Sequence, residues 1–269
     1  MHSDVPCEFP EGCDGSAILQ RLDQVLDPEL DESILDLGFV RSVELHAGHA
    51  DIALRLPTSW CAVNFAYLMA EDVRHALLDV GDIREVTVRL GDHCAAAEIE
   101  AAVNAGQSFA DAFPGEGAGS LAALRATFLR KGFLIRQQRL LRELRETGFA
   151  AAAICALRLA EVSVRDSVFV IQRSDHGPVT GGPAVILQRY LQRRAELGFD
   201  CSPTAALIID LDGRPFAPER LQAHYEAART MRIALEANGS FCRALMARAS
   251  CDVAKTAANI KTGGRHVQA

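Results

Sequence analysis

The sequence predicts an α/β fold, with a small two-layer α-β-β-α-β domain at the N-terminus and a mostly helical C-terminal domain. Apolar residues recur at helical spacing over residues 16–26 and 61–79, and they alternate at strand spacing over residues 39–56 and 85–90. Beyond residue 95 nearly every apolar pattern has the helical period. We therefore expect a flexible tail at residues 1–15, an α/β domain at 16–94, and a helical domain with two short strands at 95–269.

Each element of the N-terminal domain follows from a local signal. Ser16 can cap a first helix, which ends at Asp27-Pro28 because a residue before proline disfavours helical backbone. Two strands are expected at Phe39–Leu45 and Ala50–Leu56, joined by a short glycine-containing hairpin. A helix then fills residues 61–79, and a third strand covers 85–90. Residues 1–15 contain two prolines and two glycines, which is typical of a loose tail.

The C-terminal domain is read in the same way. Helical spacing predicts helices at residues 95–113, 120–147, 183–197 and 218–251, while β-branched runs predict the two strands at 167–172 and 205–210.

Composition excludes several classes of protein. The sequence shows no secretory signal and no apolar run long enough to cross a membrane, so we expect a cytoplasmic protein without a membrane partner. Its arginines alternate with apolar residues and form no dense basic patch, which argues against nucleic acid. The eight cysteines form no CxxC pair, and no Walker, nucleophile-elbow or dinucleotide motif is present. We therefore expect a protein that is not an enzyme.

The predicted topology gathers chemistry-bearing residues at one edge of the sheet. A helical crossover makes the second and third strands parallel, so their carboxyl ends meet at the same rim. The loop after the first helix should reach that rim as well. The candidate metal ligands there are Asp27, Cys61 and His93, with Glu29, Asp92 and Cys94 as further candidates. A thiol at a helix start is readily deprotonated, thiolates bind soft metals or attack disulfides, and carboxylates suit iron.

Cys61 is the strongest candidate among these metal ligands, although a cysteine at a helix start can also be a small buried core residue. Cys242 lies in a predicted helix, does not share a face with Cys251, and receives no role from the sequence.

Residues 16–94 resemble the iron–sulfur cluster assembly family that includes the SufT and PaaD proteins. The matching motifs are Asp27-Pro28-Glu29, Leu37-Gly38-Phe39-Val40, the segment from Thr58 to Cys61, and Val86–Leu90. The resemblance implies that Asp27 and Cys61 are the functional residues and that the cargo is iron or a transient iron–sulfur cluster. The chain departs from the family at Ala62, where proline is usual, and at Trp60, where small residues are common.

The segment Cys61–Met69 is similar to a longer subgroup found beside multicomponent di-iron monooxygenases. This resemblance implies a metal or cluster maturation factor, acting as a chaperone for a client metalloenzyme apoprotein such as a di-iron monooxygenase.

Charge separates the two parts of the chain. Residues 1–98 contain 6 arginines, no lysine and 19 acidic residues, whereas residues 99–269 contain 22 basic and 16 acidic residues. We expect the C-terminal part to pack on the acidic domain and to contact a client or a second copy of the chain. Two alternatives stay open. A metal-dependent enzyme would show an open coordination position beside a substrate pocket, and a structural interaction module would bury Cys61 among apolar side chains.

Overall fold

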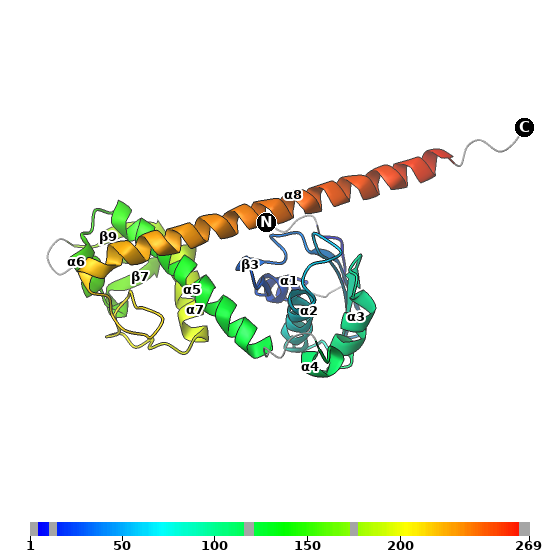
Figure 1. The fold of residues 1–269 in the computed structure, drawn as a ribbon, viewed down its shortest axis with the longest axis horizontal. Helices are drawn as coiled ribbons and strands as arrows, with labels where there is room; N and C mark the ends of the chain where they lie inside the picture. The colour runs from blue at the N-terminus through cyan, green and yellow to red at the C-terminus, as the bar shows by residue number, and fades with distance from the viewer. Residues whose placement is uncertain (1–4, 11–14, 116–120, 173–176, 264–269) are drawn as a thin grey trace, which may run out of the picture. The chain divides into compact units, whose positions relative to one another are not determined.

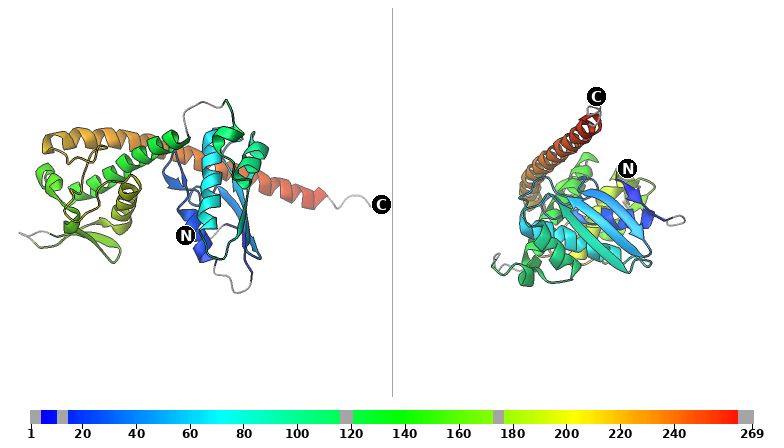
Figure 2. Two further views of the ribbon diagram at one scale, coloured as in Figure 1. Left: turned by 90° about the horizontal axis from the view of Figure 1, so that it is seen from below. Right: turned by 90° about the vertical axis from the view of Figure 1, so that its right-hand side faces the viewer.

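Alternating apolar and polar residues build a four-stranded sheet in the N-terminal part of the chain (Figures 1 and 2). The computed structural model describes residues 5–10, 15–115, 121–172 and 177–263, with side chains placed as far as residue 248. The sheet order is β1-β4-β5-β6, with the strands β1 (Cys7–Glu8), β4 (Val40–His46), β5 (His49–Arg55) and β6 (Glu85–Gly91). Strands β4 and β5 form the expected hairpin, and β5 runs parallel to β6, which confirms the predicted crossover.

One face of this sheet carries the helices and the hydrophobic core. The helices are α1 (Ser16–Asp23), α2 (Val63–Leu78), α3 (Ala96–Asn104) and α4 (Phe109–Ala112). Ala50, Ile52 and Leu54 of β5 are buried beneath them, while the alternate residues of the strand stay half-exposed. The domain therefore has two layers, as the alternation predicts, and the expected α/β fold class is confirmed.

The helix expected over residues 95–113 is in fact two helices. Helix α3 ends at Asn104, whose side-chain amide accepts from Val88 N–H at 2.8 Å and donates to Val88 O at 2.9 Å, which ties the helix to β6. Gly106 then adopts a positive φ of 67°, and Ser108 caps α4 through the Asp111 N–H. Glycine at a positive φ ends helices.

Two parts of the N-terminal region differ from the sequence prediction. Residues 7–8, expected in the flexible tail, form β1 and pair in parallel with β4. The loop after α1 contains a two-stranded antiparallel ribbon made of β2 (Leu26–Asp27) and β3 (Glu32–Ser33). The ribbon closes a tight turn over Asp27-Pro28-Glu29-Leu30-Asp31, in which Asp31 has a φ of 55° and its N–H donates to Asp27 O.

The chain divides into two compact units, residues 1–124 with 236–269, and residues 125–235. This division differs from the expected boundary at residues 94 and 95, because α3, α4 and the C-terminal half of the last helix belong to the same compact unit as the N-terminal sheet. That helix, α8, runs from Pro218 to Gly263, beyond the predicted end at residue 251. Among the described residues, no helix has both the length and the apolar character needed to cross a membrane.

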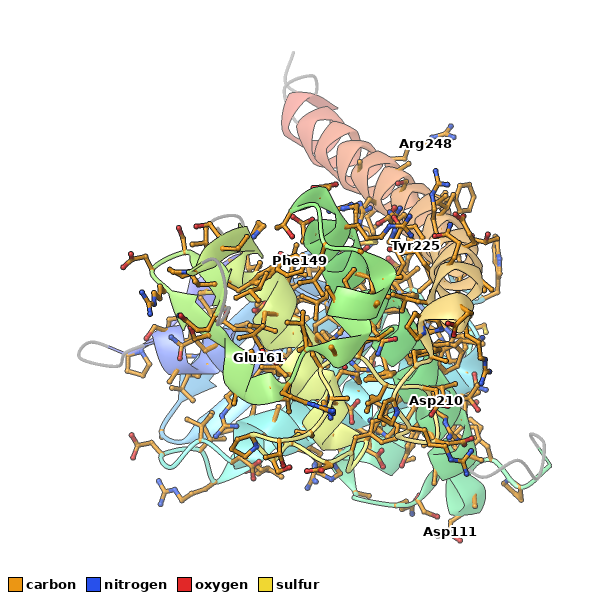
Figure 3. The ribbon with its side chains drawn as sticks, turned by 90° about the vertical axis from the view of Figure 1, so that its left-hand side faces the viewer. Asp111, Phe149, Glu161, Asp210, Tyr225 and Arg248 are labelled. Atoms are coloured by element: carbon orange, nitrogen blue, oxygen red, sulfur yellow. The ribbon has the colours of Figure 1, made fainter. Side chains whose placement is uncertain are left out.

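The second unit is mostly helical. It contains most of α5 (Leu121–Glu146), α6 (Ala151–Ala156), a 3-10 turn (Leu159–Glu161), α7 (Ala184–Glu196) and the start of α8. Tyr225, labelled in Figure 3, lies on α8 beneath the guanidinium of Arg145, which is 4.4 Å from the ring centre. A three-stranded antiparallel sheet joins β7 (Val162–Arg165), β8 (Val168–Ile171) and β9 (Val179–Pro183).

The expected pair of strands was therefore only half right. Strand β8 matches the prediction for residues 167–172, but residues 205–210 form no strand. The buried Arg194 explains this difference. Its guanidinium donates hydrogen bonds to the carbonyl oxygens of Ala206 and Leu207 at 2.8 and 3.0 Å, in place of the backbone N–H groups of a neighbouring strand. Strand β9 escaped prediction since it contains two glycines, which are rare in strands. A side chain at Gly181 would collide with the Phe169 ring.

Candidate functional site

Two segments that lie far apart in the sequence meet at the carboxyl ends of β5 and β6. The backbone N–H of Cys94 donates to Ser59 O at 2.8 Å, and the His93 ring bonds Cys61 O at 2.8 Å. The loop that follows β6 is thus attached directly to the turn that follows β5. This geometry confirms that Cys61 and His93 lie at the same end of the sheet.

Cys61 lies two residues before the first residue of α2, in the turn between β5 and that helix. Its thiol is partly exposed and shares a hydrogen bond of 3.3 Å with the hydroxyl of Thr58. The side chain also packs against the edge of the N-terminal core. Cys61 is therefore held in place yet open to solvent, which is unlike a structural cysteine buried among apolar groups.

His93 fastens the Cys61 turn. It is 7% exposed, and its Nδ1 accepts from Ala95 N–H at 3.1 Å. The ring proton is consequently on Nε2, which donates to Cys61 O. Both ring nitrogens are therefore used by backbone groups. This arrangement makes His93 a positioning residue for Cys61 and leaves neither nitrogen available to a metal.

Asp27 is a buried carboxyl group on the β2–β3 ribbon, 8% exposed. Its Oδ1 accepts from the N–H groups of Glu29 and Leu30 at 2.9 and 2.8 Å. Burial raises the pKa of Asp27 to about 6, against the opposing effect of the two N–H donors; nearby Glu29 and Glu32 add to the rise. Asp27 therefore changes charge close to neutral pH.

The three further candidate ligands are all exposed. Asp92 lies 3.7 Å from the guanidinium of Arg55, in an ion pair at the rim. Cys94 and Glu29 face solvent. Nothing in the structure draws these three side chains toward a common point.

Helix α8 brings a further thiol, that of Cys242, to the N-terminal core, and the sequence analysis gave this residue no role. Along one face of the helix, Gly239, Cys242, Arg243 and Met246 lie at the i, i+3, i+4, i+7 spacing that packs against a neighbour. Arg243 forms an ion pair with Glu32 of β3, and Met246 is buried in the N-terminal core. The i, i+4 spacing of Cys242 and Met246 in the sequence indicates a packed face of the helix. It does not identify the part of the protein against which that face packs.

Cys242 lies within electrostatic reach of the two residues that the sequence singled out. Partial burial raises the pKa of the Cys242 thiol, and the charges of Asp27, Cys61 and Glu29 raise it further in that order, against a smaller opposite effect of Arg243. Like Cys61, the Cys242 side chain packs against the N-terminal core. Cys61 and Cys242 are thus two partly buried thiols that both border the N-terminal core.

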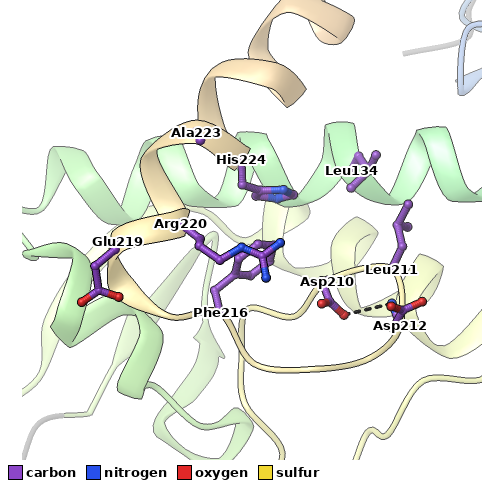
Figure 4. A pocket seen from close by; sticks show the side chains of 9 residues that line it. All are labelled: Leu134, Asp210, Leu211, Asp212, Phe216, Glu219, Arg220, Ala223 and His224. Carbon is purple, nitrogen blue, oxygen red and sulfur yellow. Dashed lines mark hydrogen bonds between the residues drawn. The ribbon is translucent and has the colours of Figure 1, made fainter.

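The second unit has a pocket of its own (Figure 4). Its volume is about 510 Å³, and His224, Phe216 and Arg220 lie on its wall. His224 stacks on Phe216 with ring centres 4.3 Å apart and bonds Gln137 Oε1 at 2.6 Å. Burial lowers the pKa of His224. In neither unit do the described residues include three or more His, Cys, Asp or Glu side chains arranged to hold a metal ion.

Part of the chain is similar to known proteins. Residues 16–90 match the family model described as iron–sulfur cluster assembly protein. A curated relative, an iron–sulfur cluster carrier protein from Deinococcus radiodurans, is 35% identical over 75 residues. That match covers 28% of this chain and 21% of the relative, so the chain spans only about a fifth of the relative's length. Residues 16–90 are therefore similar to the iron–sulfur cluster assembly family.

Proposed function

We propose that this protein carries iron or a transient iron–sulfur cluster to a client apoprotein in the cytoplasm, with Cys61 as the thiol that holds the cargo. The observation that carries the proposal is the position of Cys61. It lies in a turn fastened by His93, partly open to solvent, in a domain similar to the iron–sulfur cluster assembly family. A carrier needs such a ligand, firmly placed but accessible to a second protein.

Asp27 is proposed to manage the proton that accompanies cargo exchange. Metal ligands must lose their protons before they bind, so loading a thiol releases a proton and unloading it takes one up. Asp27, with a pKa of about 6, can accept and return a proton near neutral pH.

The client is proposed to be a metalloenzyme apoprotein, such as a di-iron monooxygenase, and the resemblance of Cys61–Met69 supports this class. Trp60, directly before Cys61, is 77% exposed and offers an aromatic contact beside the thiol. Exposed tryptophan is common at protein interfaces. A second copy of the chain is the other partner that could use this contact.

Anaerobic reconstitution with ferrous iron and sulfide tests the proposal. The wild-type chain should gain iron, sulfide and visible absorbance, and it should pass the cluster to an apo-ferredoxin. Cys61→Ser should lose both properties, whereas Cys201→Ser, which alters an exposed thiol of the second unit, should keep them. Equal loading and transfer by Cys61→Ser and wild type would refute the proposal.

One structural observation weighs against the alternative of a purely structural interaction module. Cys61 is partly exposed and is not buried among apolar side chains.

A further inference from the structure

The pocket of the second unit has one wall that is positioned by buried hydrogen bonds. Gln137 of α5 is fully buried, and its Nε2 donates to Ile209 O at 2.8 Å, which fixes the orientation of the amide. Its Oε1 therefore accepts from His224 Nε2 at 2.6 Å. The proton of the His224 ring is consequently on Nε2, and Nδ1 is the acceptor of the ring. Burial lowers the pKa of His224, which favours this neutral form.

A second wall is a tight loop that carries a carboxylate. Oδ1 of Asp210 accepts from the N–H groups of Asp212 and Arg214, each at 2.9 Å. Arg130 of α5 donates to Leu211 O at 2.9 Å and so ties the loop to the helix. Both walls therefore have defined positions, which lowers the entropy cost of binding a ligand.

Charged and apolar side chains share the lining of this pocket. Figure 4 shows the guanidinium of Arg220 pointing to the side on which Asp210 lies, whereas the carboxylate of Glu219 points away. Asp212 is paired with Arg214 at 3.0 Å. The charges at the pocket are therefore nearly balanced. The apolar part of the lining consists of Leu134, Leu211, Phe216 and Ala223.

A neutral ligand with both hydrogen-bond donors and acceptors suits these walls. Arg220 can donate to a carbonyl oxygen, while His224 Nδ1 and the Asp210 carboxylate can accept from N–H groups. An anion would be attracted by Arg220 but repelled by Asp210, and a cation would meet the reverse. A peptide backbone offers a carbonyl and an N–H group at every residue except proline. The pocket volume of about 510 Å³ also leaves room for an apolar side chain of the same peptide.

We propose that the pocket of the second unit binds a short segment of a partner polypeptide, through its backbone amides and one apolar side chain. Arg220 and His224 hold the amides, and Phe216, stacked on the His224 ring with centres 4.3 Å apart, contacts the apolar side chain. Peptide binding here goes beyond the proposed function and requires no cargo at Cys61, which lies in the other compact unit. Failure of the reconstitution assay would thus leave it untouched.

The capped tripeptide acetyl-Gly-Phe-Gly-amide, titrated against the full-length protein by ligand-observed NMR, tests this site. Wild type should bind it, whereas acetyl-Gly-Gly-Gly-amide should bind at least about tenfold more weakly because it buries no apolar side chain. Arg220→Met should weaken binding about tenfold, the usual effect of losing a hydrogen bond to a charged group. Ala223→Trp should abolish binding by filling the pocket. Arg229→Met is the matched control, because Arg229 is an exposed arginine of the same helix outside the lining.

A second measurement uses the wild-type protein, so it holds even if a variant folds poorly. A tripeptide with photoreactive benzoylphenylalanine in place of phenylalanine should cross-link to Leu134 or to residues 210–224, as located by mass spectrometry. Cross-links confined to other residues would overturn the proposal, and so would equal binding by Arg220→Met and Arg229→Met. Tighter binding of benzoate or benzylammonium than of the tripeptide would also overturn it, because the pocket would then select an ion rather than a peptide.

Discussion

Replacing Asp27 with asparagine should make the empty N-terminal unit more stable at neutral pH. A pKa of about 6 in the folded protein, against an ordinary value near 4, corresponds to about 3 kcal/mol at 1.36 kcal/mol per pH unit. A carboxyl group whose pKa is raised by folding stabilises the fold while it is protonated. That contribution is complete below about pH 4 and is lost as the pH rises through about 6. The asparagine Oδ1 can still accept from the N–H groups of Glu29 and Leu30.

The measurable quantity is the difference in free energy of unfolding between Asp27→Asn and wild type. It should grow by up to about 3 kcal/mol in favour of the variant between pH 4 and pH 7.5. Urea unfolding combined with pulsed hydrogen exchange at one fixed labelling pH resolves peptides of β5 and β6 from those of the second unit. This resolution matters because a chain with two compact units need not unfold in one step.

Asp82→Asn is the matched control, since Asp82 is an exposed carboxylate in the same unit and should change stability by less than about 0.5 kcal/mol. The same Asp27→Asn protein should load iron and sulfide poorly, because it cannot exchange the proton. A variant less stable than wild type at pH 7.5, or a stability difference independent of pH, would refute the reasoning.

Three further predictions test the site and the second unit. Trp60 is the sole tryptophan, so loading iron or a cluster at adjacent Cys61 should quench its fluorescence; quenching that persists in Cys61→Ser would count against cargo at that thiol. His93→Phe should lower the free energy of unfolding by about 1–3 kcal/mol and speed alkylation of Cys61, because Cys61 O and the Ala95 N–H lose their hydrogen-bond partner. An unchanged alkylation rate would contradict the positioning role of His93. Arg194→Met should destabilise the second unit by about 3 kcal/mol or more, because several buried carbonyl oxygens lose their hydrogen-bond donor. Native-state hydrogen exchange of α7 should become faster, and an unaltered exchange rate in α7 would contradict this prediction.

Local patterns in the sequence were enough to predict most of the N-terminal architecture. Alternation at Ala50, Ile52 and Leu54 predicted a strand with one buried face, and the helix that follows made β5 and β6 parallel. The meeting of Cys61 and His93 followed from that topology, because parallel strands end at the same edge. These properties depend on short-range periodicity and on connection handedness, both of which a sequence displays directly.

Tertiary structure alone decided how those residues are used. The sequence presented His93 as a ligand, but the backbone of Cys61 and Ala95 takes both of its ring nitrogens. Cys242 received no role from the sequence. Residues spaced i, i+4 on a helix indicate that this face packs against another part of the protein, but they do not identify that part, which is the N-terminal core. About 180 residues separate Cys242 from Cys61, and only the packing of α8 brings both side chains against the same N-terminal core. Contacts at that separation arise from side-chain fit over the whole fold, which no local pattern records.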